Sequence, residues 1–183
     1  MPTYLQQRIQ QVKNSPVANT LASLQCGIEK EGLRVGLSGR VSHKNHPQAL
    51  GSSLTHSSIT TDYSESLLEY ITPVFQSPSA ALDFMQELHS FSASKLQNIG
   101  EYVWPASMPC YLDGEDDIRI ADFGSSNTGK LKHTYRLGLA WRYGKIMQSI
   151  AGLHFNFSPQ DNFWPAYQQL LSDEQSLCDF KSS

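Results

Sequence analysis

The sequence predicts an α+β fold, and three observations indicate it. Segments 26–35 and 152–158 have the glycine-bounded, apolar-rich composition of strands. Segment 78–99 carries apolar residues at helical spacing. The 183 residues suffice for one domain with a core and are marginal for two. With few strands in so long a chain, we expect residues 1–183 to form part of a larger α+β sheet domain.

Composition excludes several functional classes. The net charge is −3, with 39% hydrophobic and 17% charged residues. A nucleic-acid-binding protein would carry a basic stripe, and none is present. No apolar run approaches the ~20 residues that cross a bilayer. We therefore expect neither a nucleic-acid partner nor a membrane.

The N-terminus and the cysteines predict a cytoplasmic protein. Residues 1–13 predict a polar amphipathic helix with Leu5, Ile9 and Val12 on one face, without the uninterrupted apolar stretch of a secretory signal. The cysteines are odd in number and widely spaced, which is typical of reduced thiols. Each is expected to be a small core residue: Cys26, Cys110 and Cys178.

In the first half of the chain, strand 26–35 is followed by a turn at Ser38-Gly39. Residues 42–61 are rich in Ser, Thr, His, Asn and Gly and predict a long loop. A strand then covers 66–74. Ser77 and Pro78 have the residue types that begin a helix. The helix ends before Gly100 and places on its apolar side Leu82, Met85, Leu88 and Leu96.

In the second half, residues 101–133 predict mostly loop. A helix is expected over 134–148, burying Leu137, Trp141 and the neighbourhood of Ile150. Strand 152–158 alternates clearly, with Leu153, Phe155 and Phe157 on one side and His154, Asn156 and Ser158 on the other. A further helix begins near 162. Residues 172–183 show no closing element, so we expect a disordered or truncated end, with a naturally short form as the alternative.

Glu29 and Glu31 are the first candidate site. They lie two apart in a predicted strand, so both side chains leave the same face. Two adjacent carboxylates repel each other unless a cation lies between them. Mg²⁺ prefers such oxygen ligands. The simpler interpretation is a pair of exposed glutamates on a solvated sheet face.

Asp62, Glu65 and Glu69 form a second group. In a strand, Glu69 is the only charge in an apolar run, and it then requires a partner or a metal. In a helix, the three carboxylates would share an ordinary solvated face. The β-branched and aromatic residues after Glu69 favour the strand.

His154 is the third element. It lies beside Asn156 on the polar side of its strand. A neutral imidazole can complete a site that carboxylates begin. The alternative is a structural histidine with a satisfied hydrogen bond.

The basic residues near the glycine-rich segment 124–129 suggest anion binding only weakly. The segment is not a phosphate-binding P-loop, because Lys130 is followed by Leu131 where a P-loop needs Ser or Thr. It presents backbone N–H groups to an anion or, more simply, caps the following helix. Arg34 and Arg136 have the guanidinium that binds phosphate or carboxylate bidentately, whereas a surface position is the simpler interpretation.

Several blocks, in order, resemble proteobacterial glutamate–cysteine ligases. The first is Gly27-Ile28-Glu29-Lys30-Glu31-Gly32-Leu33-Arg34-Val35. The next blocks lie at 46–52, 59–73, 104–110 and 126–129. The last include Tyr135-Arg136, Arg142-Tyr143-Gly144, Met147-Gln148 and Gly152-Leu153-His154-Phe155-Asn156-Phe157-Ser158. Each block is weak alone, whereas the ordered set from about residue 20 to 165 is specific.

The resemblance implies a fold, a site and a reaction. The fold is a glutamine synthetase-like antiparallel sheet with flanking helices, curved into a saddle. The implied ligands of Mg²⁺ or Mn²⁺ are Glu29, Glu31, Asp62, Glu69 and His154. The implied substrate-binding residues are Tyr135, Arg136 and Gln148. The implied reaction ligates the γ-carboxylate of L-glutamate to the amine of L-cysteine with ATP, through γ-glutamyl phosphate.

The family chain continues beyond residue 183 and supplies further ligand, substrate and nucleotide residues. We therefore expect these 183 residues alone to be inactive. Two alternatives remain. One is another carboxylate–amine ligase of the same fold, such as a fused glutathione-forming enzyme. The other is a non-catalytic remnant or binding module.

Overall fold

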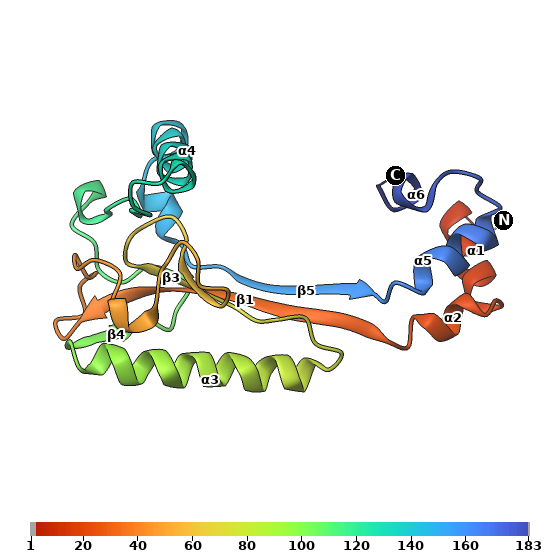
Figure 1. The fold of residues 1–183 in the computed structure, drawn as a ribbon, viewed down its shortest axis with the longest axis horizontal. Coiled ribbons are helices and arrows are strands. Elements are labelled where there is room, and N and C mark those ends of the chain that lie inside the picture. Colours follow the sequence, from red (N-terminus) through yellow and green to blue (C-terminus); the bar gives the residue numbers. More distant parts are fainter. Residues whose placement is uncertain (1–2, 183) are drawn as a thin grey trace.

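The computed structural model describes residues 3–182. Figure 1 shows a main body and a small helical lobe joined by the long strands β1 and β5. The strands are β1 (Leu24–Gly36), β2 (Ile59–Thr61), β3 (Leu67–Ile71), β4 (Glu101–Val103) and β5 (Leu153–Pro159). The helices are α1 (Tyr4–Lys13), α2 (Val17–Thr20), α3 (Pro78–Gln97), α4 (Asn127–Tyr143), α5 (Phe163–Leu171) and α6 (Leu177–Ser182). The α+β fold with an antiparallel sheet is thus confirmed.

Strand β1 organises the sheet because it pairs with three others. Residues 29–33 pair antiparallel with β3, residues 34–36 with β4 and residues 24–30 with β5. Strand β2 extends the sheet beyond β3, again antiparallel. The predicted strand over 66–74 is confirmed as the shorter β3, which ends at Ile71, so the helical alternative for Glu69 is wrong.

Different helices lie on the two faces of the sheet. Helix α3 runs along one face, and α4 stands on the opposite side (Figure 1). Met85 and Leu96 of α3 are buried against the β-strand residues Leu68 and Tyr70. Leu82, predicted on the same side, is 55% exposed. Ser77 occupies the position before α3, where its carbonyl accepts the Ala81 amide at 3.1 Å but its side chain accepts no backbone amide of the helix.

A buried ion pair fixes the end of β1 to β4. Arg34 is completely buried and its Nη1 lies 2.6 Å from Oε2 of Glu101, which is 1% exposed. Arg34 Nη2 donates to the carbonyls of Lys44 (2.7 Å) and Glu65 (3.0 Å). The hydroxyl of Ser42 donates to the other Glu101 oxygen. The simpler interpretation of Arg34 as a surface charge is therefore wrong.

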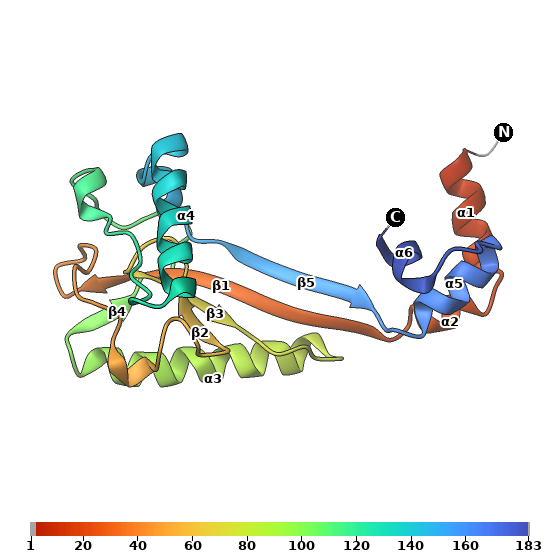
Figure 2. The ribbon, with the colours of Figure 1, turned by 45° about the horizontal axis from the view of Figure 1, so that its top comes forward.

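A second lobe holds both ends of the chain (Figure 2). Residues from α2 and α5 line a shared crevice, and Val17 of α2 is buried. The ring of Phe163 stacks on Tyr167 with centroids 5.2 Å apart. The predicted N-terminal helix is confirmed as α1, although Leu5 and Ile9 are exposed.

Several sequence-based boundaries are wrong. The loop expected over 42–61 ends in β2, and the loop expected over 101–133 contains β4 and the start of α4. The helix expected over 134–148 begins at Asn127 and ends at Tyr143, and a short 3₁₀ turn follows at Ile146–Ser149. The end, expected without regular structure, contains α6; residue 183 lies outside the described residues.

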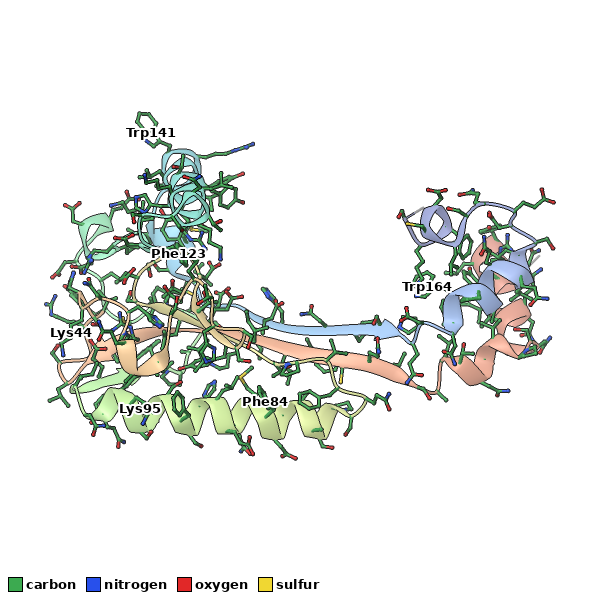
Figure 3. All side chains as sticks on the ribbon, viewed as in Figure 1. Lys44, Phe84, Lys95, Phe123, Trp141 and Trp164 are labelled. Atoms are coloured by element: carbon green, nitrogen blue, oxygen red, sulfur yellow. The ribbon has the colours of Figure 1, made fainter. Side chains whose placement is uncertain are left out.

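Apolar side chains expected in the core are instead on the surface. Trp141 is 90% exposed, Leu137 43% and Ile150 41%, and Figure 3 shows Trp141 at the free end of α4. The apolar side chains of β5 are more than half exposed: Leu153, Phe155 and Phe157. Cys26 and Cys110 are buried as predicted, whereas Cys178 is exposed.

None of the helices within residues 3–182 has the length and apolar character needed to span a membrane.

Candidate functional site

The sheet register brings acidic and imidazole side chains onto one face. Glu31 on β1 is the cross-strand partner of Glu69 on β3, and Glu29 on β1 is the partner of His154 on β5. Directly opposite residues point to the same side of a sheet. The four side chains therefore share the face opposite α3, and the prediction that Glu29 and Glu31 lie on one face is confirmed.

Glu29 and His154 already interact. His154 Nδ1 lies 3.3 Å from Oε2 of Glu29, with 59% and 37% of the two side chains exposed. This contact leaves the second ring nitrogen of His154, Nε2, free to face Gly152 and Glu31. An imidazole held by a carboxylate through one nitrogen presents the other as a ligand.

Glu31 is fixed by the residue before β5. Its Oε2 accepts a hydrogen bond from the Gly152 amide at 2.7 Å, and its own amide donates to the Gly152 carbonyl at 2.9 Å. Burial raises the pKa of Glu31, the Gly152 hydrogen bond lowers it, and the charge of Asp62 raises it further. Glu31 is thus held in place but carries an unfavourable charge.

Glu69 bears the strongest electrostatic penalty of the group. Burial, together with the charges of Asp62, Glu31 and Glu29, raises its pKa to about 7. Only Arg136 acts in the opposite direction among the causes of this shift. A group of carboxylates that raise one another's pKa is stabilised by a bound cation.

Asp62 enters the site from the end of β2, where Arg136 of α4 holds its backbone. Arg136 Nε donates to the Asp62 carbonyl at 2.5 Å, and Nη2 lies 4.0 Å from Oδ1. The Arg136 guanidinium also covers the ring of Phe123 at 4.7 Å. Burial lowers the pKa of Arg136, and the charges of Asp62 and Glu69 oppose that effect.

Glu65 does not join the group, contrary to its grouping with Asp62 and Glu69 in the sequence. It is 5% exposed, and its two oxygens accept the backbone amides of His46 (2.7 Å) and Asp122 (2.8 Å). Glu65 therefore ties two loops together. The spacing of three residues between Asp62 and Glu65 does not distinguish a carboxylate that ties loops together from one that joins the acidic group.

The other predicted substrate residues lie near α4 without reaching the carboxylates. Tyr135 neighbours Arg136 and is 64% exposed. Gln148 lies in the 3₁₀ turn after α4. Among residues 3–182, neither side chain makes a hydrogen bond to the acidic group.

The glycine-rich segment 124–129 begins α4. Ser126 occupies the capping position, and its hydroxyl accepts the Gly129 amide at 3.1 Å. Gly129 lies so close to the Phe123 and Gly124 carbonyls that a Cβ would be 2.5 and 2.8 Å away. The helix-capping interpretation is confirmed.

The donor set suits a hard divalent cation. Carboxylate oxygens and one imidazole nitrogen are its ordinary ligands. Burial raises the pKa values of Glu31 and Glu69, and the charges of His154 and Arg136, respectively, oppose that rise only in part. Within the described part of the chain, no three such groups are close enough to form a ready-made metal site. These side chains share a face, and they would have to lie closer together to ligate one ion.

The fold and this face together define an α+β protein whose antiparallel sheet carries a carboxylate-rich site. Residues 9–183 match the sequence model of the glutamate–cysteine ligase family. The chain is 57% identical over 162 residues to a glutamate–cysteine ligase of Hahella chejuensis, and 55% identical over 157 residues to one of Pseudomonas entomophila. The chain belongs to the glutamate–cysteine ligase family.

The alignments cover most of this chain and a minority of each relative. They include 88% and 86% of the chain, but only 31% and 29% of the two relatives. The chain therefore spans less than a third of the length of these curated relatives.

Solved structures of related proteins have the same fold. The crystal structure of a Francisella tularensis glutamate–cysteine ligase in complex with AMP matches with a TM-score of 0.78 and 41% identity, covering 86% of this chain and 31% of that one. A bifunctional glutathione synthetase from Pasteurella multocida matches with a TM-score of 0.78 and 29% identity, covering 95% of this chain and 22% of that one.

Proposed function

We propose that the protein carrying this chain is a cytoplasmic, ATP-dependent ligase that joins the γ-carboxylate of L-glutamate to the amine of L-cysteine, the first step of glutathione biosynthesis. Membership of the glutamate–cysteine ligase family supports the reaction. The observation that carries the proposal is the shared sheet face of Glu29, Glu31, Glu69 and His154, with Asp62 beside them.

The reaction requires no protein nucleophile. The γ-carboxylate oxygen of glutamate takes the terminal phosphoryl group of ATP, which gives γ-glutamyl phosphate and ADP. The amine nitrogen of cysteine then attacks the γ-carbonyl carbon. The C–N bond forms, the C–O bond to phosphate breaks, and the amine loses a proton. Positioning and charge neutralisation supply most of the catalysis of phosphoryl transfer.

In this proposal the four carboxylates and His154 hold Mg²⁺ or Mn²⁺. A bound divalent cation neutralises phosphate charge and orients the triphosphate. The chain's own residues contribute the positioning of these ligands. Glu31 is oriented by Gly152, Glu29 orients His154, and Arg136 fixes the backbone of Asp62. Tyr135, Arg136 and Gln148 are proposed to contact the amino-acid substrates.

A cavity beside Glu29 offers room for part of the nucleotide. It has a volume of about 280 Å³ and opens on the strands β1 and β5. Its lining includes Glu29, Gly27, Asn156 and Ser158. The Francisella relative was solved with AMP, and a nucleotide bound beside Glu29 would place its phosphates at the acidic group.

The direct test is ADP release by the purified protein with glutamate, ATP and Mg²⁺. We expect release to require cysteine and to be small with ammonia or other amines. ADP release that depends on ammonia and not on cysteine would assign a different carboxylate–amine ligase and contradict the proposal.

The similarity to the bifunctional Pasteurella protein favours a second candidate, a fused enzyme that also makes glutathione. Such a protein would release a second ADP per product when glycine is added. The DNA downstream of Ser183 gives an independent test. An in-frame continuation supports a longer ligase, and an immediate stop codon supports a non-catalytic remnant.

A further inference from the structure

Gly152 lies at a special place on the acidic face. It immediately precedes Leu153, which pairs with Lys30, so it continues the register of β5 opposite Glu31. The Glu31 amide donates to the Gly152 carbonyl at 2.9 Å, which agrees with this position. A side chain on Gly152 would therefore project onto the same face as Glu31 and His154.

The need for glycine here is spatial. Gly152 is absent from the glycines with positive φ, so its backbone suits any residue. A Cβ on Gly152 would lie 3.1 Å from Nε2 of His154 and 3.4 Å from Oε1 of Glu31. Gly36, near the other end of β1, has open space where a Cβ would be.

The atoms that face this space are those available to a ligand. Oε2 of Glu31 is engaged by the Gly152 amide, which leaves Oε1. Nδ1 of His154 is engaged by Glu29, which leaves Nε2. These two remaining atoms are the polar atoms that approach the position that a Gly152 side chain would fill.

We propose that Gly152 is a positioning residue for the cation site: its amide orients Glu31, and its missing side chain keeps open the space that Glu31 Oε1 and His154 Nε2 share. The inference rests on the proposed cation-dependent function and deepens it. Gly152 itself touches neither cation nor substrate. It acts through the two ligands on either side.

The experiment measures Mn²⁺ binding by the purified chain, from the loss of the free-ion electron paramagnetic resonance signal, beside the apo melting temperature. Gly152→Ala and Gly152→Val are compared with Gly36→Ala. Strands tolerate Ala and favour Val over Gly, and the exposed His154 ring can shift. We therefore expect the apo melting temperature to change by no more than a few degrees.

Mn²⁺ affinity should fall about ten-fold for Gly152→Ala, the scale seen when groups that orient metal ligands are lost, and further for Gly152→Val. Gly36→Ala should leave it unchanged. In a His154→Ala background, Gly152→Ala should cost less affinity than alone, because one of the displaced ligands is gone. A merely structural role would lower melting temperature and affinity together.

The outcomes distinguish the positioning role of Gly152 from the existence of the cation site. Unchanged affinity in Gly152→Ala, with binding by the unsubstituted chain, would overturn the role of Gly152 and leave the cation site standing. Absence of Mn²⁺ binding by the unsubstituted chain would overturn the cation site and this inference with it. If Gly152→Val does not fold, the comparison of Gly152→Ala with Gly36→Ala decides.

Discussion

Glu31 and Glu69 are direct cross-strand partners on β1 and β3, so two partly buried carboxylates occupy neighbouring places on one sheet face. Like charges in directly opposite positions destabilise a sheet. Burial, and with it the charges of Asp62, Glu31 and Glu29, raises the pKa of Glu69 to about 7. In the proposed function, this arrangement lowers the stability of the cation-free state and favours binding of a cation.

The first prediction concerns Glu69→Gln without divalent cation. A carboxyl with a raised folded pKa binds protons more tightly when folded, so its destabilising effect begins above the ordinary pKa of 4.5 and is complete above about 7. Glu69→Gln should therefore be more stable than the unsubstituted chain at pH 8, and similar to it near pH 4. The side chain is partly exposed, so screening reduces the gain to about 1 kcal/mol.

Thermal unfolding in EDTA at both pH values measures this difference. The matched control is Glu87→Gln, an exposed carboxylate on α3, which should show no such pH dependence. Added Mg²⁺ should raise the melting temperature of the unsubstituted chain more than that of Glu69→Gln. An equal melting-temperature difference at pH 4 and pH 8 would contradict the prediction.

The second prediction concerns turnover. In a protein that shows the proposed ligase activity, Glu31→Gln or Glu69→Gln should lower kcat by about 10²-fold or more, because each removes charge that holds the cation against phosphate. Mg-ATP binding should weaken as well. Initial rates across a Mg²⁺ series test this, with Glu87→Gln as control. Near-normal kinetics in both variants would remove these residues from the site.

The sequence predicted the local features of this fold well. Strand 26–35, strand 66–74 and strand 152–158 have alternation or composition that a short window contains. Strands β2 and β4 have three residues each and form because β3 and β1 provide partners, which no local pattern indicates. The first turns of α4 contain glycine and lysine without apolar periodicity, so only the Ser126 cap marks its beginning.

The site residues also divide into those that a local pattern predicts and those whose positions depend on the whole sheet. Alternation alone places Glu29 and Glu31 on one face. That Glu69 and His154 lie opposite them depends on strand order and register, and the family resemblance provided this where the residue pattern did not. Gly152 was not identified, because a glycine at the end of a strand has many ordinary explanations. Its position opposite Glu31 indicates its role, and that position follows only from the strand register.

The third prediction concerns the ion pair that fixes β1 to β4. Arg34→Met leaves the buried carboxylate of Glu101 without its guanidinium partner, and breaking a buried pair in this way costs about 3–5 kcal/mol. Urea unfolding at pH 7 measures the loss. Arg40→Met breaks an exposed pair with Asp113 and should leave the midpoint nearly unchanged. Equal effects of the two substitutions would contradict the assigned burial.

The fourth prediction concerns the chain of 183 residues by itself. Among the described residues, the basic side chains that lie within ion-pair distance of the acidic face are those of Arg136 and His154. The triphosphate of ATP needs more positive charge than these two groups and a cation supply. We expect this chain alone to release no ADP in a cysteine-dependent manner, even where it binds Mn²⁺. Cysteine-dependent ADP release above a no-enzyme blank would refute this.

The last prediction concerns the apolar side of β5. Phe155 and Phe157 are 55% and 69% exposed on alternate positions of one strand. Neighbouring exposed aromatic residues form the kind of patch that binds hydrophobic dyes and promotes self-association. The double substitution Phe155→Ser and Phe157→Ser should lower dye fluorescence and the apparent mass in sedimentation. The melting temperature should change little, because these side chains bury little area. Phe91→Ser on α3, where the ring is 42% exposed, is the control. If Phe91→Ser lowered dye binding as much, the patch on β5 would have no special role.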